Sequence, residues 1–491
     1  MRIFVKLFFG AACVSLVGVL TASCAETGCE GPGTCPPPVG PVTDSSGGEG
    51  GVDGGPDTPA GCTVGQGPKE SPACIEDSFA VFVSPTGDDN AKGTKAAPVR
   101  SISTGVALAA ASKQPHVYVC EGSYDKNVQI TAPLAVFGGV TCQWSASETA
   151  RPKLAPAKGI ALWVTKVTGA VIIQDLDVLG SAEASTPGSS AIAAFVSEST
   201  NVTFRRLNLS AGAGTEGAQG AIGSNWAGAA KPGVAALDGG LAVTCSCSDA
   251  SMSVGGKGGA IGVGGDNGSA TPPIGSANGG GGGNNCTPGF AGANGVSGIG
   301  GTGATIAGTF DSNKQWTSAS DAKSGGSGNP AQGGGGGGGK NGAGAGGGGG
   351  CGGCGGGGGG PAGSGGSSFA LLSLSSNVTL QGGTLISGAG GTGGRGGAGQ
   401  PGQAGAIGGP GACDGAAGGA GAGGSGGGGG AGGNSAPIGF VGIEPKAMAA
   451  MLTPGTKGGS GPGGQPGAGL GAAGTAGAPG PDGKSQNTLA L

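Results

Sequence analysis

Glycine accounts for 127 of the 491 residues, and this constrains the fold more than any other feature of the chain. Charged residues make up only 10% and aromatic residues 4%, so a uniformly packed globule of this length is not expected. The net charge is −4, and the lysines and arginines are scattered along the chain. This distribution excludes the basic footprint of a nucleic-acid-binding protein.

The glycines have a period in two regions. From Gly390 to Gly411, and again from Gly471 to Gly483, glycine occupies every third position. That spacing suits helices of the polyproline-II type, in which only a hydrogen atom fits at a crowded contact. These stretches contain few prolines, which argues against collagen. The favoured expectation is loops without fixed structure, and a bundle of polyglycine-II helices is the alternative.

The first residues have the pattern of an export signal. Arg2 and Lys6 precede an uncharged apolar run from Leu7 to Leu20, which is short for a membrane span. Leu20, the small residues at 21–23 and Cys24 resemble a bacterial lipobox, with Thr21 as the departure from that pattern. We therefore expect a signal peptide over residues 1–23, lipidation of Cys24 and an outer-membrane or cell-surface lipoprotein. The alternative is cleavage after Ser23 and secretion.

Residues 24–78 are rich in proline, glycine and cysteine, and this composition predicts a tether. The chain has 14 cysteines, which in an exported protein indicate disulfides. The close spacings of Cys245 with Cys247 and of Cys351 with Cys354 raise zinc as an alternative. Because the chain has a single histidine and no second well-spaced pair, no metal site and no cofactor are expected.

Residue 79 begins a strand-like segment, which is followed by a Gly-Asp loop ending in Gly-Thr and then by a helical pattern. A helix is expected over Val99–Ser112, opened by Pro98, and the next segment reads HVYVCEGSYDKNVQI. Residues 79–130 resemble the N-terminal module of right-handed parallel β-helix proteins of the pectin-lyase-like superfold. The resemblance implies a capping helix and a first coil, and it implies no particular activity, since that fold hosts many functions.

Repeats beyond this module support stacked coils. Val171–Val178 is followed 31 residues later by the similar Val202–Leu209, and Asn201–Phe204 is similar to Asn377–Leu380, 176 residues further on. Coils of this kind bury their inward faces by stacking. Cys120 and Cys142 lie 22 residues apart, about one coil, so we expect them to form a disulfide.

The expected fold is therefore all-β: a short right-handed parallel β-helix with an N-terminal capping helix and long glycine-rich insertions. The expected organisation is the cap and coils over 79–211, an insertion over 212–367, a coil over 368–388, an insertion over 389–434, a final strand within 435–453, and a glycine-rich tail over 454–491.

The outward face of the coils offers the strongest candidate for chemistry. Asp175 and Asp177 alternate with apolar residues, which points both carboxylates to one strand face, as in an acid–base pair of a glycosidase. The favoured interpretation is structural: Asp175 pairs with Arg206, and Asp177 pairs with Asn208 in the next coil. Arg205 and Arg206 complete this alternative site.

Other candidates have simpler explanations. Asp88, Asp89 and Asn90 offer oxygen ligands for Ca²⁺, but their spacing favours a turn. His116 has no evident partner for a catalytic triad, and no glycine run ends in the Lys-Ser/Thr of a phosphate loop.

No catalytic residue is therefore assigned. The favoured function is a lipid-anchored surface protein with a structural, adhesive or glycan-binding role, whose partners are the membrane and surface or matrix polysaccharide. The alternative is a polysaccharide lyase or glycoside hydrolase acting on the outer face of the β-helix.

Overall fold

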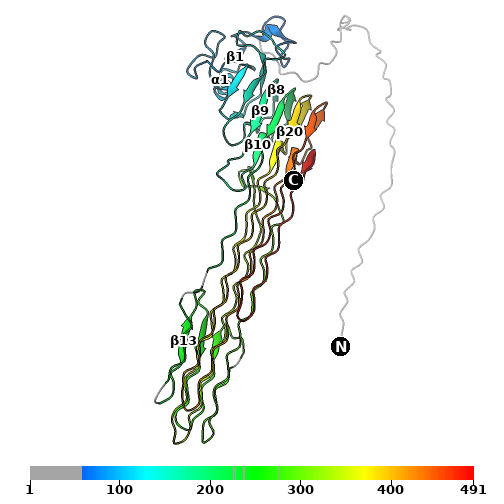
Figure 1. The fold of residues 1–491 in the computed structure, drawn as a ribbon. Helices are drawn as coiled ribbons and strands as arrows, with labels where there is room; N and C mark the ends of the chain where they lie inside the picture. The colour runs from blue at the N-terminus through cyan, green and yellow to red at the C-terminus, as the bar shows by residue number, and fades with distance from the viewer. Residues whose placement is uncertain (1–57, 225, 227, 236–237, 276) are drawn as a thin grey trace, which may run out of the picture. The chain divides into compact units, whose positions relative to one another are not determined.

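The strands of the protein wind into coils, and each full coil contributes one strand to each of three parallel sheets (Figure 1). The computed structural model describes residues 58–491 except 225, 227, 236, 237 and 276. The expected signal peptide, Cys24 and the tether up to residue 57 lie outside the described residues. The expected parallel β-helix is confirmed.

We call the three sheets A, B and C. Sheet A contains β1 (Ala80–Val83), β2 (His116–Cys120), β5 (Leu134–Val140), β8 (Ala170–Gln174), β11 (Asn201–Arg205), β19 (Val378–Gln381) and β22 (Lys446–Met448). Sheet B contains β3 (Gly122–Tyr124), β6 (Pro152–Leu154), β9 (Asp177–Gly180), β12 (Asn208–Ala211), β20 (Thr384–Ile386) and β23 (Met451–Thr453). Sheet C contains β4 (Val128–Ile130), β7 (Leu162–Thr165), β10 (Ala191–Ser197), β18 (Ser368–Leu374), β21 (Ser435–Val441) and β24 (Thr488–Ala490).

The register of the sheets follows the sequence repeats. Val202 pairs with Val171 of the preceding coil and with Val378 of the following coil. Two residues further along each strand, Phe204 pairs with Ile173 on one side and with Leu380 on the other. These inward side chains are buried and form continuous apolar columns through the stack. The chain on either side of residues 212–367 therefore belongs to one stack.

Helix α1 (Ile102–Ser112) covers the first coil. It begins three residues later than expected, because Val99 forms a bridge with Val83 and Ser101 caps the helix by accepting a hydrogen bond from the Thr104 amide at 3.3 Å. Asp89 accepts hydrogen bonds from the Ser101 amide at 2.7 Å and from the Ser101 hydroxyl at 3.0 Å. Together with the Lys126 ammonium, these donors hold the pKa of Asp89 well below its usual range, so this loop anchors the helix.

The segment 58–78 differs from the expected tether, because it packs on the outer face of sheet A. The 3₁₀ helix η1 (Pro72–Cys74) and a disulfide between Cys62 and Cys74 close this segment. Cys74 and Ile75 are buried in an apolar cluster with aromatic residues of β1, β2 and β5. Residues 58–78 are therefore part of the folded domain.

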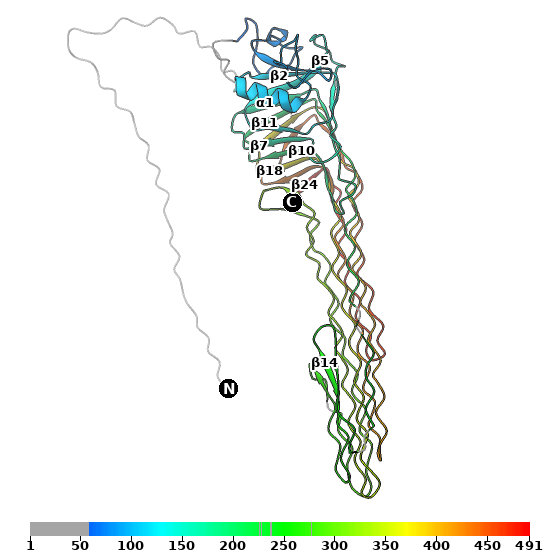
Figure 2. The same ribbon diagram turned by 90° about the vertical axis from the view of Figure 1, so that its left-hand side faces the viewer.

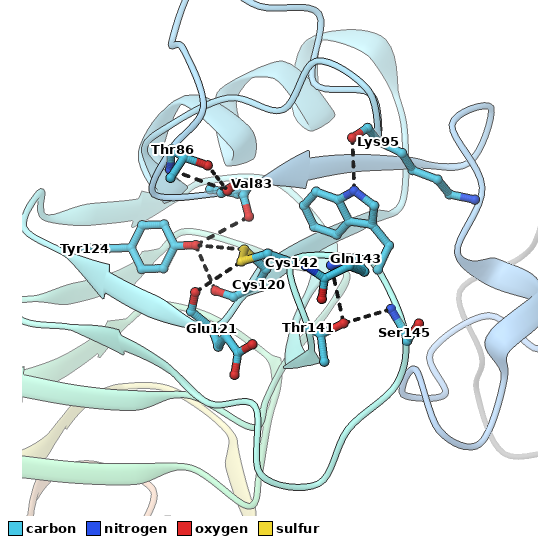
Figure 3. Close-up of a disulfide and its surroundings, with 12 residues drawn as sticks. Val83, Thr86, Lys95, Cys120, Glu121, Tyr124, Thr141, Cys142, Gln143 and Ser145 are labelled. Carbon is cyan, nitrogen blue, oxygen red and sulfur yellow. Dashed lines mark hydrogen bonds between the residues drawn. A yellow bond between two sulfur atoms is a disulfide. The ribbon is translucent and has the colours of Figure 1, made fainter.

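A second disulfide joins neighbouring coils, as Figure 3 shows. Cys120 at the end of β2 bonds to Cys142, which follows β5, and this is the pair expected from the coil spacing. The Tyr124 hydroxyl donates to the Cys120 carbonyl oxygen at 2.8 Å, and Trp144 Nε1 donates to the Lys95 carbonyl oxygen at 3.0 Å (Figure 3). The disulfide therefore lies among contacts that fasten the first coils to the capping loop.

The glycine-rich segments all leave the stack at the same corner, between a strand of sheet B and the next strand of sheet C. They comprise residues 212–367 between β12 and β18, 387–434 between β20 and β21, and 454–487 between β23 and β24. Gly212, Gly388 and Gly455 hold equivalent positions at this corner, because Ser210, Ile386 and Thr453 are aligned in sheet B. The expected final strand and tail are thus corrected: β22 and β23 follow β21, and the tail returns as β24.

These segments run side by side (Figure 2) and are joined by hydrogen bonds at every third residue. The amides of Gly391, Gly394 and Gly397 donate at 2.8–2.9 Å to the carbonyl oxygens of Gly366, Gly363 and Gly360. Those three glycines in turn donate to Thr215, Ala218 and Ala221 at 2.7–2.9 Å. Hydrogen bonding between neighbouring segments with a three-residue period is the pattern of a polyglycine-II bundle. The favoured expectation of loops without fixed structure was wrong, and the alternative holds.

The bundle also contains short antiparallel strands. Strands β13 (Val243–Ser246), β14 (Met252–Gly255) and β15 (Ser269–Thr271) form one small sheet, and β16 (Thr309–Phe310) pairs with β17 (Trp316–Thr317). From residue 58 onward, none of the helices combines the length and apolar character needed to cross a bilayer.

Candidate functional site

Asp175 and Asp177 lie at the corner between sheets A and B. The expected continuous strand is interrupted there: β8 ends at Gln174, β9 begins at Asp177, and Asp175 adopts a left-handed φ of 59°. Arg206 takes the same conformation at the same corner of the next coil, with a φ of 48°. The two carboxylates therefore do not share one strand face, which corrects the geometry expected for an acid–base pair.

The charged groups at this corner bind one another. Arg206 donates to both oxygens of Asp175, at 2.8 Å from Nε and 2.6 Å from Nη2, and this contact raises the pKa of the guanidinium. Arg151 Nε donates to Asp177 at 2.8 Å, and its Nη1 lies 3.4 Å from Asp175. Asn208 Nδ2 also donates to Asp177 at 2.8 Å. The favoured structural pairing across coils is what the structure contains.

A pocket of about 350 Å³ lies over this corner, between the coils and the segment 58–78. Its charged lining residues are Lys69, Glu70, Glu148, Arg151, Asp175 and Arg206. Lys69 pairs with Glu148, and Arg206 Nη1 lies 3.7 Å from Glu70. Since each of these charges has an opposite partner within the pocket, the arrangement fastens the segment 58–78 to the coils and provides no free acid or base.

Arg205 does not join this cluster. Its Nε donates to Gln381 at 3.0 Å, and its Nη1 donates to the Gly65 carbonyl oxygen at 2.6 Å. The side chain thus connects β11 to β19 and to the segment 58–78 on the outer face of sheet A. Of the four candidate residues, the structure brings together Asp175, Asp177 and Arg206 and places Arg205 apart.

His116 is fully buried at the start of β2 among Phe79, Tyr118 and Phe137. Its Nδ1 lies 3.2 Å from the Tyr118 hydroxyl, and its Nε2 accepts from the Gly65 amide at 3.4 Å. Burial lowers the pKa of His116 to about 4, so the ring is neutral at pH 7. The residue packs the segment 58–78 onto sheet A.

Two disulfides join the four cysteines whose close spacings had suggested a zinc site: Cys245 bonds to Cys351, and Cys247 bonds to Cys354. Cys245 lies on β13 and Cys247 directly follows that strand, whereas Cys351 and Cys354 are three residues apart, a spacing that puts them on one face of a polyglycine-II helix. Within the described part of the chain, no group of three or more His, Cys, Asp or Glu side chains is arranged to hold a metal ion.

The glycine-rich bundle, which the sequence raised only as the alternative to loops, is a larger feature than the charged corner. Segment 413–434 hydrogen-bonds to six others: 287–304, 323–339, 346–366, 388–411, 455–468 and 472–484. A side chain on almost any of its glycines would overlap a neighbouring carbonyl group, as at Gly427 against Gly360. Segment 212–224 lies at the edge of the bundle, and there glycine is needed only at every third position. A segment with more neighbouring segments therefore needs glycine at more of its positions.

We call the end of the bundle formed by the turns at 257–264, 339–346 and 407–415 the tip. Its turns are joined by hydrogen bonds, such as that from the Gly339 amide to the Val263 carbonyl oxygen at 2.8 Å. A disulfide between Cys286 and Cys413 links the first insertion to the second beside the tip. This disulfide thus joins the first two insertions covalently next to the tip.

Apolar side chains point into solvent at the tip. Ile261, Val263 and Ile407 are 56%, 57% and 72% exposed, and Leu241, next to Gly240, which bonds to Gly346, is 63% exposed. A glycine bundle needs no such residues for its own packing, since its contacts are between backbones. Exposed apolar side chains also lie elsewhere along the bundle, such as Ile222 at 67% and Ile299 at 86%, and those at the tip are candidate contacts for a partner.

The three parallel sheets and the capping helix define the class as a parallel β-helix protein with a polyglycine-II bundle inserted at one corner. Residues 85–148 match a family of proteins of unknown function, DUF1565, which is associated with parallel β-helix proteins. The match runs from the loop after β1 through α1 to the second coil. No curated protein and no solved structure matches the chain.

Proposed function

We propose that this is an exported, lipid-anchored cell-surface protein in which the β-helix holds a polyglycine-II bundle whose tip makes adhesive contacts with a neighbouring surface or matrix. The observation that carries the proposal is the construction of the bundle. Three insertions leave one corner and bond to one another along their length, and disulfides cross-link the first insertion internally and to the second. Such an arrangement supports a presented structure rather than a loop that covers an active site.

Two further features support a surface location. The ten described cysteines form five disulfides, which persist in oxidising compartments outside the cytosol. The export signal and Cys24 have the pattern of a lipidated N-terminus, and two acyl chains on one cysteine provide stable anchoring.

Lipid anchoring is tested by metabolic labelling with an alkyne fatty acid in cells that express the full chain or the Cys24→Ala variant. We expect label and membrane association in the natural chain and loss of both in the variant. A natural chain that is exported without label would contradict the lipid anchor and favour secretion after cleavage at Ser23.

Adhesion is tested with beads that carry the purified chain without its signal, on cells and on extracellular matrix. A variant with Leu241, Ile261 and Ile407 changed to serine should retain the fold, because these side chains are exposed, and should lose most bead retention. The matched control changes the exposed Met448 and Met451 of β22 and β23 to serine, away from the bundle. Equal retention of both variants would contradict a role of the tip.

A further inference from the structure

A second pocket, of about 420 Å³, lies where the three insertions meet the last coil. Its apolar lining comes from the first insertion, from strands β21 and β24 of sheet C, and from the residue after β24: Ile306, Phe310, Trp316, Val441, Leu489 and Leu491. The first insertion thus brings residues of the β16–β17 hairpin to strands more than 120 positions away in the sequence. A pocket of this size is typical of small-ligand sites.

The aromatic wall of the pocket is held by the coils. The Phe310 ring stacks on Phe195 with centroids 6.1 Å apart, and the Trp316 ring meets Phe369 edge to face at 5.5 Å. Trp316 Nε1 also donates to the Ser190 hydroxyl at 3.2 Å. The hairpin therefore has a fixed position on the outer face of sheet C, and the pocket that it lines is preformed, so no rearrangement is needed before a ligand binds.

The polar residues that line the pocket include Asn434, Asp482 and Lys484. Asp482 is neutralised by Lys457 at 2.7 Å and accepts from the Ser460 amide at 2.9 Å. Asn434 Oδ1 accepts from the Lys484 backbone amide at 2.9 Å, which fixes the Lys484 backbone at the pocket. Among the described residues, the Lys484 ammonium has no ion-pair partner within 4 Å. The lining of the pocket thus combines a lysine ammonium with apolar and aromatic side chains.

We propose that this pocket binds one pyranose ring of an acidic polysaccharide. A pyranose has an apolar face of C–H groups that fits Phe310 and Trp316, and a belt of hydroxyl groups that fits Asn434 and Asp482. The carboxylate of a uronic acid is the group that Lys484 would bind. This assignment goes beyond the proposed adhesion, which is placed at the tip, and it names the polysaccharide class that the pocket would recognise.

The test is isothermal titration of the chain without its signal against galacturonic acid and glucuronic acid oligomers, with a neutral glucose oligomer in a parallel titration. Acidic oligomers should bind and neutral ones should bind at least about ten-fold more weakly, the loss of one charge-assisted contact. The Lys484→Gln variant should lose about ten-fold in affinity for the acidic oligomers, and Lys340→Gln, an exposed lysine at the tip, should lose none.

Several results would overturn this assignment. Absence of saccharide binding, equal affinity for neutral and acidic oligomers, or an unchanged affinity in the Lys484→Gln variant would each do so. Because the Lys484 side chain is exposed, the variant should keep the fold, which circular dichroism would verify. Failure of the pocket is distinguishable from failure of the proposed adhesion, because beads would still be retained through the tip when no oligomer binds.

Discussion

At the scale of single residues, the protein depends on positions that must lack a side chain. Gly458 and Gly459 are neighbours in the last insertion with opposite requirements. A methyl group at Gly458 would overlap the carbonyl oxygen of Gly391, whereas at Gly459 the nearest atom would be Thr392 Cγ2 at 3.9 Å. The pair therefore separates the effect of steric overlap from that of replacing glycine.

We expect Gly458→Ala to lower the free energy of unfolding by about 1–3 kcal/mol, because neighbouring backbones must move apart. Gly459→Ala should change it by less than about 0.5 kcal/mol. Chemical denaturation of both variants provides the measurement. If the two substitutions cost the same, the close backbone contact in this segment would be wrong.

His116 gives the fold a specific dependence on pH. Its pKa is about 4 when folded and 6.5 as the ordinary value, so the unfolded chain binds the proton more tightly between these limits. The neutral ring makes its full contribution to the free energy of unfolding above about pH 6.5. This contribution decreases as the pH falls towards 4, by about 3 kcal/mol in total. Urea denaturation at pH 7.5 and 4.5 should show this loss, and a His116→Gln variant should lose less over the same range.

Ser373 is fully buried in β18, between Val196 and Phe440 in neighbouring coils, and its hydroxyl has no hydrogen-bond partner in the described part of the chain. Replacing it with alanine removes an unsatisfied polar group and keeps almost the same volume. We expect Ser373→Ala to raise the free energy of unfolding by about 1 kcal/mol. A lower melting temperature for the variant would contradict this environment.

At the scale of elements, the sequence was informative wherever local pattern decides structure. The coils around Val171, Val202 and Val378 could be placed, because inward apolar residues repeat there in register. The last coil was missed because β22 and β23 are short and mostly exposed, and within these two strands only Leu452 packs against the main core cluster. The glycine at the insertion corner, Gly455 after Leu452, was the available signal, since Gly212 and Gly388 follow Leu209 and Leu385 at the same spacing.

The sequence did not predict the hydrogen-bonded packing of the bundle or the backbone turn at the charged corner as well as it predicted the coils. Each bundle segment is held by partners far away in the sequence, such as Gly220 bonding to Arg395, so no local pattern distinguishes it from a loop. At the charged corner, the pairing of Asp175 with Arg206 followed from the repeat register, but the left-handed turn at Asp175 has no mark in the sequence.

The disulfide between Cys286 and Cys413 is expected to couple two elements, because it joins the first insertion to the second. Changing both cysteines to serine should leave the coils intact and loosen the tip, with a stability cost of about 2–5 kcal/mol. Limited proteolysis should then cut near residues 281–287 and 408–414 before the coils. Identical cleavage patterns in both proteins would indicate that the backbone contacts alone hold the tip.

At the scale of the whole molecule, one principle connects the coils and the bundle. A parallel β-helix repeats the same corner in each coil, so insertions at equivalent positions leave side by side. Insertions that are rich in glycine can then bond to one another through their backbones. The described chain from residue 58 onward accordingly belongs to one compact unit.

Hydrogen exchange of the chain without its signal, followed by mass spectrometry, tests this account most directly. Amides of segments 346–366 and 413–434 should exchange slowly, at rates comparable to those of β11 and β18, because their N–H groups are bonded to neighbouring segments. Exchange of these glycine amides at the rate of an unstructured chain would contradict the bundle and restore the view of the insertions as loops.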